Sequence, residues 1–145
     1  METLHYLLMR THTALNRQIL SQAAGIGLTP GQPKILDYLI DHEGSDQKTI
    51  AACCVIEPAT VGSILTGMEE AELVRRTQRP GNRRSLFVTL TDRGREAASR
   101  MAEIFRRADR QALQALTPQE RETLLSLLSK LYAAQTGGIG EVRHD

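Results

Sequence analysis

The densest group of side chains able to do chemistry in this 145-residue sequence is a run of arginines. Between Arg75 and Arg84 there are five arginines and no acidic residue. A guanidinium group keeps its charge and carries a fork of donors that fits phosphate oxygens, so such a block is typical of a nucleic-acid contact. Eleven arginines and four acids give residues 75–110 a net charge of +7, against −6 for the rest. Residues 93–110 mix acids with bases and fit a solvated helix face equally well.

Apolar spacing and turn residues indicate which elements would position these arginines. Helices are predicted over about 3–23, 30–43, 46–54 and 58–71. Thr29 and Gln32 match a capping box around Pro30, and Asp46 is a suitable N-cap for the third helix. Two short helices separated by the three-residue turn 55–57 are a helix-turn-helix candidate.

The pattern then changes to that of a β-hairpin. Strands are predicted over about 75–78 and 85–90, with Leu86, Val88 and Leu90 on one side. Pro80 and Gly81 suit the middle of a type II turn, so they mark the tip. A hairpin directly after a helix-turn-helix is a wing.

Two further helices complete the predicted fold. Thr91 caps a long helix over 92–116, and the sequence Thr117-Pro118-Gln119-Glu120 is a capping box for the last helix. Six apolar residues within positions 124–132 exceed what one packed face needs, which indicates a subunit interface. The expected fold class is mainly α with a small β-hairpin. A winged helix-turn-helix at 29–91 lies within a single domain over 1–145, flanked by dimerisation helices at 1–24 and 92–136 and a flexible tail at 137–145.

The fourth helix is the one expected to enter a DNA major groove. Its outward side chains are small and include no Arg, Asn or Gln, so direct base readout is modest and specificity leans on the wing and on DNA shape. The start of the third helix and the base of the wing are expected to meet phosphates. The predicted DNA-binding residues are Gln47, Lys48, Thr49, Ala59, Thr60, Gly62, Ser63, Thr66, Arg75, Arg76, Asn82, Arg83, Arg84 and Ser85.

Several segments resemble the MarR family of bacterial transcription regulators. They are residues 28–32 (LTPGQ), 50–51 with 56–61 (IEPATV), 68–76, and 82–94 (NRRSLFVTLTDRG). The resemblance implies a homodimer that binds double-stranded DNA at a pseudo-palindromic operator, acts as a repressor, and inserts Arg84 into the minor groove. The family has Asp where this chain has Asn82, so the ion pair that would orient Arg84 becomes at most a neutral hydrogen bond.

The resemblance also implies a small-molecule effector as a further partner, bound between the dimer helices and the winged part. This would place Leu8, His12 and Asn16 near Tyr38; the alternative is that His12 and Asn16 cap backbone groups or face water. Of the two cysteines, the core-side Cys54 is interpreted as packing. The outward Cys53 is the candidate redox thiol.

The sequence also argues against several functions. The four histidines show no metal-ligand spacing, no nucleophile–base motif or phosphate loop stands out, and neither metal, cofactor nor enzymatic activity is expected. No apolar run approaches the ~20 residues that span a bilayer and the N-terminus is unlike a signal peptide, so a cytoplasmic protein without membrane contact is expected. Two alternatives stay open: a helical protein-interaction dimer and an architectural DNA-binding dimer.

Overall fold

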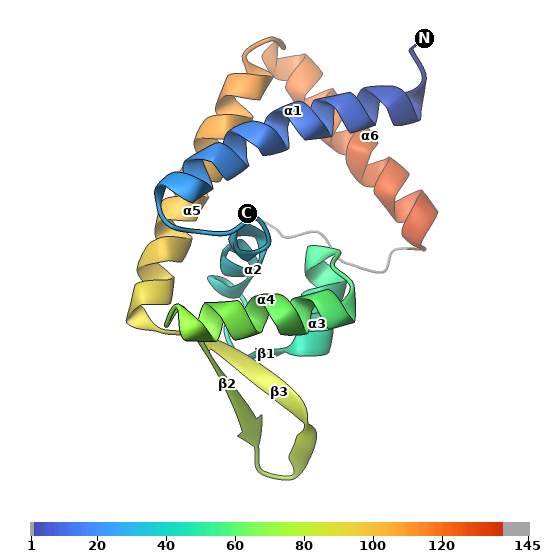
Figure 1. Cartoon of the computed structure of the whole chain (residues 1–145). Helices are drawn as coiled ribbons and strands as arrows, with labels where there is room; N and C mark the ends of the chain where they lie inside the picture. Colours follow the sequence, from blue (N-terminus) through green and yellow to red (C-terminus); the bar gives the residue numbers. More distant parts are fainter. Residues whose placement is uncertain (1, 138–145) are drawn as a thin grey trace. The chain divides into compact units, whose positions relative to one another are not determined.

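The computed structural model describes residues 2–137 as helices and a small sheet (Figure 1). Two compact units result, one up to Ala108 and one from Asp109. The predicted fold class, mainly α with a winged helix-turn-helix, is confirmed. The elements are α1 (Leu4–Gly25), α2 (Gln32–Leu39), β1 (Ser45–Asp46), α3 (Gln47–Cys54), α4 (Pro58–Glu70), β2 (Val74–Arg79), β3 (Asn82–Leu90), α5 (Asp92–Leu113) and α6 (Pro118–Thr136).

The core of the first unit holds the helix-turn-helix and the hairpin together. On α4 the predicted apolar stripe is buried at Val61, Leu65 and Met68, while Ile64 is half-buried. Helix α1 contributes only Ile19 and Ala23 to the buried core, so most of this helix is not part of it. Side chains from seven elements, α1 to α5 with β2 and β3, share this core, among them Ile35, Leu36, Leu39, Ile50, Val88 and Met101.

The sheet has three antiparallel strands in the order β1-β3-β2. Strands β2 and β3 form the predicted wing, and the φ of +81° at Gly81 fits the third position of a type II turn. Strand β3 begins at Asn82, three residues earlier than predicted. Strand β1, in which Ser45 pairs with Val88, was not predicted, because two polar residues carry no alternating pattern.

Helix α2 is shorter than the predicted 30–43. Half of the expected capping box forms, since the Thr29 N–H donates to Gln32 Oε1 at 3.2 Å. Pro30 lies in a turn, so the helix begins at Gln32, and turns fill the chain after Leu39. One of these turns carries Glu43, whose carboxylate accepts from the Leu90 N–H at 2.9 Å and thereby ties α2 to the wing.

The wing leads directly into α5 through a tight junction. The Thr91 hydroxyl accepts from the Gly94 N–H at 2.9 Å, which confirms Thr91 as the cap, and donates to the Glu72 carbonyl at 2.5 Å. A Cβ at Gly94 would lie 1.9 Å from the Leu73 carbonyl oxygen. Glycine is therefore required where α5 crosses the end of the preceding loop.

The second unit comprises the end of α5 and α6. The capping box predicted for α6 is complete: Thr117 and Glu120 each bond the other's backbone N–H, and these bonds lower the pKa of Glu120. Helix α5 ends at Leu113, three residues short of the prediction, and Arg121 Nε donates to the Leu113 carbonyl at 2.8 Å. Of the predicted flexible tail 137–145, all but Gly137 lies outside the described residues.

Candidate nucleic-acid interface and ligand pocket

The first turn of α3 presents three of the predicted phosphate-contact residues. Asp46 caps the helix, as predicted, by accepting the Thr49 N–H at 2.7 Å, and this hydrogen bond lowers the pKa of the carboxyl group. The side chains of Lys48 and Thr49 are exposed, whereas Gln47 is half-buried. A rigid cap therefore fixes the direction in which these side chains leave the helix.

Helix α4 turns a row of small residues away from the core. Ala59, Thr60 and Ser63 are exposed, and Gly62 is half-buried among them. The hydroxyl of Thr66, one turn further on, donates to the Gly62 carbonyl at 3.0 Å. A face without long side chains lets the helix backbone come close to a base-pair edge.

One residue in the turn before α4 has an unusual backbone conformation. Val55 has a φ of +56° in the left-handed region and is 70% exposed. A β-branched side chain is costly there, so Val55 stores local strain in the helix-turn-helix.

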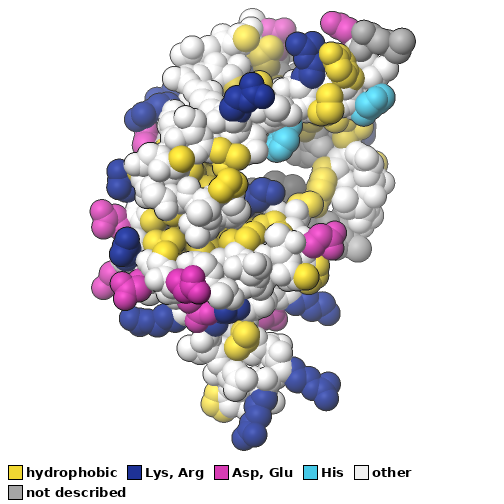
Figure 2. Space-filling view, in the orientation of Figure 1, with side chains coloured by type: hydrophobic (Ala, Val, Ile, Leu, Met, Phe, Trp, Pro, Cys, Tyr) yellow, Lys and Arg dark blue, Asp and Glu magenta, His cyan; other side chains and the backbone are white. Residues whose placement is uncertain are grey.

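The wing extends away from the core and carries basic side chains near its end (Figure 2). Arg83 and Arg84 are exposed, and among residues 2–137 neither side chain has a hydrogen bond or ion pair. The Asn82 side chain accepts from the Ser85 N–H at 3.2 Å and so stabilises the start of β3. No hydrogen bond from the Arg84 guanidinium to the Asn82 side chain forms, and Arg84 has no side-chain partner among residues 2–137.

A groove of about 290 Å³ runs between the start of α3 and the wing. Gln47, Lys48, Arg84 and Ser85 line it, so four predicted DNA-contact residues from two elements meet there. Two cations beside one groove suit a chain of phosphates.

Two arginines of the basic block bond to other parts of the chain, which their sequence pattern did not predict; Arg76 is half-buried and Arg79 is exposed. Arg76 is bonded to Gln47, Thr66 and Glu69. Arg79 donates to the Gly44 carbonyl at 2.9 Å and stacks its guanidinium 3.8 Å above the Phe87 ring. Their partners lie 7 to 35 residues away along the chain, so no local sequence pattern marks these contacts.

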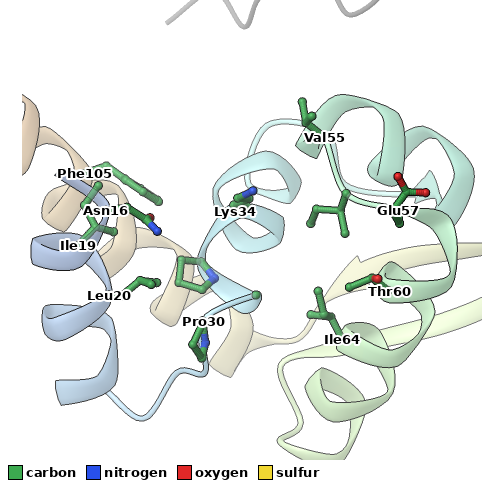
Figure 3. Close-up of a pocket in the computed structure, with 13 residues that line it drawn as sticks. Asn16, Ile19, Leu20, Pro30, Lys34, Val55, Glu57, Thr60, Ile64 and Phe105 are labelled. Atoms are coloured by element: carbon green, nitrogen blue, oxygen red, sulfur yellow. The ribbon is translucent and has the colours of Figure 1, made fainter. Parts of the chain in front are cut away.

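A larger pocket, of about 450 Å³, lies among α1, α2, α4 and α5 (Figure 3). Its walls are mostly apolar, and four polar side chains enter it from three helices and from the turn before α4. The lining residues that matter chemically are Asn16, Ile19, Leu20, Lys34, Glu57, Thr60, Ile64 and Phe105.

The residues predicted for the ligand site are not brought together. Asn16 lines the pocket, but Leu8 and His12 are exposed elsewhere on α1. The Tyr38 hydroxyl lies 3.3 Å from Ser45 Oγ, outside the pocket, because α2 turns that side chain toward β1; burial raises the pKa of Tyr38. Lys34, four residues before Tyr38 on α2, does line the pocket and was not predicted, because no local spacing marks it.

The cysteines lie as the helical spacing predicted. Cys54 is buried and donates its S–H to the Lys34 carbonyl at 3.6 Å, whereas Cys53 is exposed. Among residues 2–137 neither forms a disulfide, and no three His, Cys, Asp or Glu side chains gather as metal ligands would. No single described helix is long and apolar enough to cross a membrane, although α3 and α4 taken together, bent by 109°, reach that length and composition.

Comparison with known proteins places this geometry in a family. The MarR family model matches residues 28–86. The transcriptional repressor Rv2887 of Mycobacterium tuberculosis is 33% identical over 120 residues, which cover 82% of this chain and 86% of that protein.

Similar solved structures are also transcriptional repressors, like the relative found by sequence. The repressor CouR bound to a 23-mer DNA duplex has a TM-score of 0.81 at 30% identity, covering 90% of this chain and 92% of CouR. Rv2887 in complex with salicylic acid has a TM-score of 0.71 at 30% identity, covering 90% and 97%. The chain therefore belongs to the MarR family of DNA-binding transcriptional regulators.

Proposed function

We propose that the chain is a cytoplasmic, non-enzymatic repressor that binds a pseudo-palindromic operator as a homodimer. One observation carries the proposal: the small-residue face of α4 and the exposed arginines of the wing belong to the same compact unit. Helix α4 would enter the major groove and Arg84 the neighbouring minor groove. The structure of CouR bound to a DNA duplex supports DNA binding by this fold.

Exposed apolar side chains support the homodimer. Helix α6 has no buried residue, and six of its large apolar side chains, Leu124 to Tyr132, are 37–55% exposed. On α1, Leu4, Leu7, Leu8 and Met9 are 41–58% exposed. A second copy of the chain would remove these surfaces from water, and a dimer would present two copies of α4 to successive major grooves. The proposed division is thus a DNA-binding part at 29–91 and dimerisation helices on either side.

A salt titration of DNA binding tests the proposal. Wild type and Arg84→Ala are compared on the duplex upstream of the chain's own gene and on a scrambled duplex. Tight, salt-steep binding that prefers the upstream duplex and is weakened by Arg84→Ala is expected. Equal binding to both duplexes would favour an architectural DNA-binding protein, and no binding at low salt would favour the protein-interaction dimer.

We further propose that the 450 Å³ pocket takes a small organic acid as effector. Ile19, Leu20 and Phe105 offer apolar walls to a ring, and the Lys34 ammonium and Asn16 amide suit a carboxylate. The salicylic acid complex of Rv2887 supports this ligand class. Thr60 lines the pocket and also lies in the first turn of α4, so a ligand there would push directly on the helix that meets DNA.

Calorimetry with benzoate, salicylate and neutral benzyl alcohol tests the effector class. Binding of the two acids, loss of that binding in Lys34→Ala, and release of DNA by the acids are expected. Arg17→Ala on the exposed part of α1 is the matched control and should leave binding unchanged. Equal binding of benzyl alcohol would show that the carboxylate is not recognised.

A further inference from the structure

Arg76 lies where the wing meets both helices of the helix-turn-helix. Its Nε donates to Glu69 Oε1 at 2.7 Å, its Nη1 to Gln47 Oε1 at 3.0 Å and its Nη2 to Thr66 Oγ1 at 2.9 Å. The side chain is 16% exposed. All three nitrogens are thus engaged by protein groups on α3 and α4, and Glu69 neutralises the charge.

The contact also determines what Thr66 can do. Its oxygen accepts from Arg76, and its single proton is donated to the Gly62 carbonyl at 3.0 Å. A hydroxyl has one proton to donate, so none remains for a phosphate. Thr66 therefore supports the arginine rather than DNA.

For Gln47 the consequence is the opposite. A guanidinium group only donates, so Arg76 selects the amide oxygen of Gln47 and turns the NH₂ group outward. The outward nitrogen lies 3.9 Å from the position of a Cβ on Gly62, over the small-residue face of α4, and Gln47 also lines the groove shared with Lys48 and Arg84. The two amide protons are thus presented where phosphates would pass.

We propose that Arg76 is a positioning residue: it contacts no phosphate itself but holds the Gln47 NH₂ group as a donor to a backbone phosphate of the bound DNA. The inference rests on the proposed DNA binding. It separates two neighbouring arginines by role, since Arg75 is exposed and faces away from Arg76 on the strand.

The slope of log K against log salt distinguishes the two roles. A cation that neutralises a phosphate contributes about 0.9 to the slope, hence about 1.8 for both copies in a dimer, whereas a neutral amide contributes nothing. Arg76→Met is expected to weaken binding to the upstream duplex about tenfold with an unchanged slope. Gln47→Leu should give the same loss, and the double variant should lose no more than either single variant.

Arg75→Met is the matched control, because it removes the same charge from the same strand. A slope reduced by about 1.8 in Arg76→Met would overturn the inference, because Arg76 would then be a phosphate contact itself. Additive losses in the double variant, or no loss in Arg76→Met, would overturn it as well. Absence of wild-type binding to either duplex would overturn the proposed function and this inference with it.

A second measurement does not depend on whether the variant folds. In the free wild-type dimer, the Arg76 Nε–H proton should exchange slowly with water because Glu69 accepts it, and its resonance should not move when DNA is added. Fast exchange in the free protein, or a large shift on adding DNA, would overturn the inference. Circular dichroism of Arg76→Met shows whether its binding loss reflects unfolding.

Discussion

Replacing Gly94 by alanine should loosen the joint between the wing and α5. The added Cβ would lie 1.9 Å from the Leu73 carbonyl oxygen and 2.9 Å from its carbon, and real Cβ contacts essentially never fall below 3.0 Å. Helix and loop must therefore move apart. That movement breaks the bond from the Thr91 N–H to the Leu73 carbonyl, now 3.0 Å, and strains the bond from the Thr91 hydroxyl to Glu72.

The size of the effect follows from these terms. Overpacking costs about 2 kcal/mol and the two hydrogen bonds about 1 kcal/mol each, while alanine regains about 1 kcal/mol of helix propensity. The free energy of unfolding should thus fall by about 3 kcal/mol.

Urea denaturation followed by circular dichroism at a fixed dimer concentration measures this loss. Gly25→Ala is the matched control, because a Cβ there has nothing within 4 Å, and its stability should stay within about 0.5 kcal/mol of wild type. If Gly94→Ala were as stable as Gly25→Ala, the close approach of α5 to the loop would not exist in solution, and the wing would not be fixed by this junction.

Three further substitutions have expected outcomes. Val55→Gly should raise the free energy of unfolding by about 1 kcal/mol, measured in urea, because glycine adopts the φ of +56° without strain. Above about pH 4, wild type should be more stable to unfolding than Asp46→Asn. The difference should disappear as the pH falls through the lowered folded-state pKa of Asp46, because the carboxyl group of the unfolded chain binds its proton first. Thermal unfolding at pH 7 and pH 2.5 checks this. Leu128→Glu should convert the proposed dimer to a monomer in sedimentation analysis, because it places a charge on the apolar face of α6.

Most of the fold could be predicted because its signals are local. The capping box at Thr117 and Glu120 needs only residues three apart, and the hairpin tip needs only Pro80 and Gly81. The end of α2 and the strand β1 could not be predicted. Both depend on partners in β3, where Val88 pairs with Ser45, and such pairing over 43 residues leaves no periodic trace.

Within the candidate site, exposure was easier to predict than bonding. Helical spacing placed Thr60 and Ser63 outward and Cys54 inward, because a helix fixes direction every 3.6 residues. It did not reveal the 450 Å³ pocket, whose lining from Asn16 to Phe105 comes from separate helices. That arrangement is a product of tertiary packing.

The basic block shows why counting charges alone misjudges a DNA interface. Five arginines between residues 75 and 84 suggest five phosphate contacts per copy. Arg76 is neutralised by Glu69, and Arg79 is held by the Gly44 carbonyl and the Phe87 ring. Through these contacts Arg76 holds the wing to α3 and α4, and Arg79 holds it to the turn before β1. The exposed Arg83 and Arg84 lie on the same wing. The block is thus divided between arginines that bond within the chain and exposed arginines that we propose as DNA contacts, and within the block the salt dependence of binding should reflect only the second group.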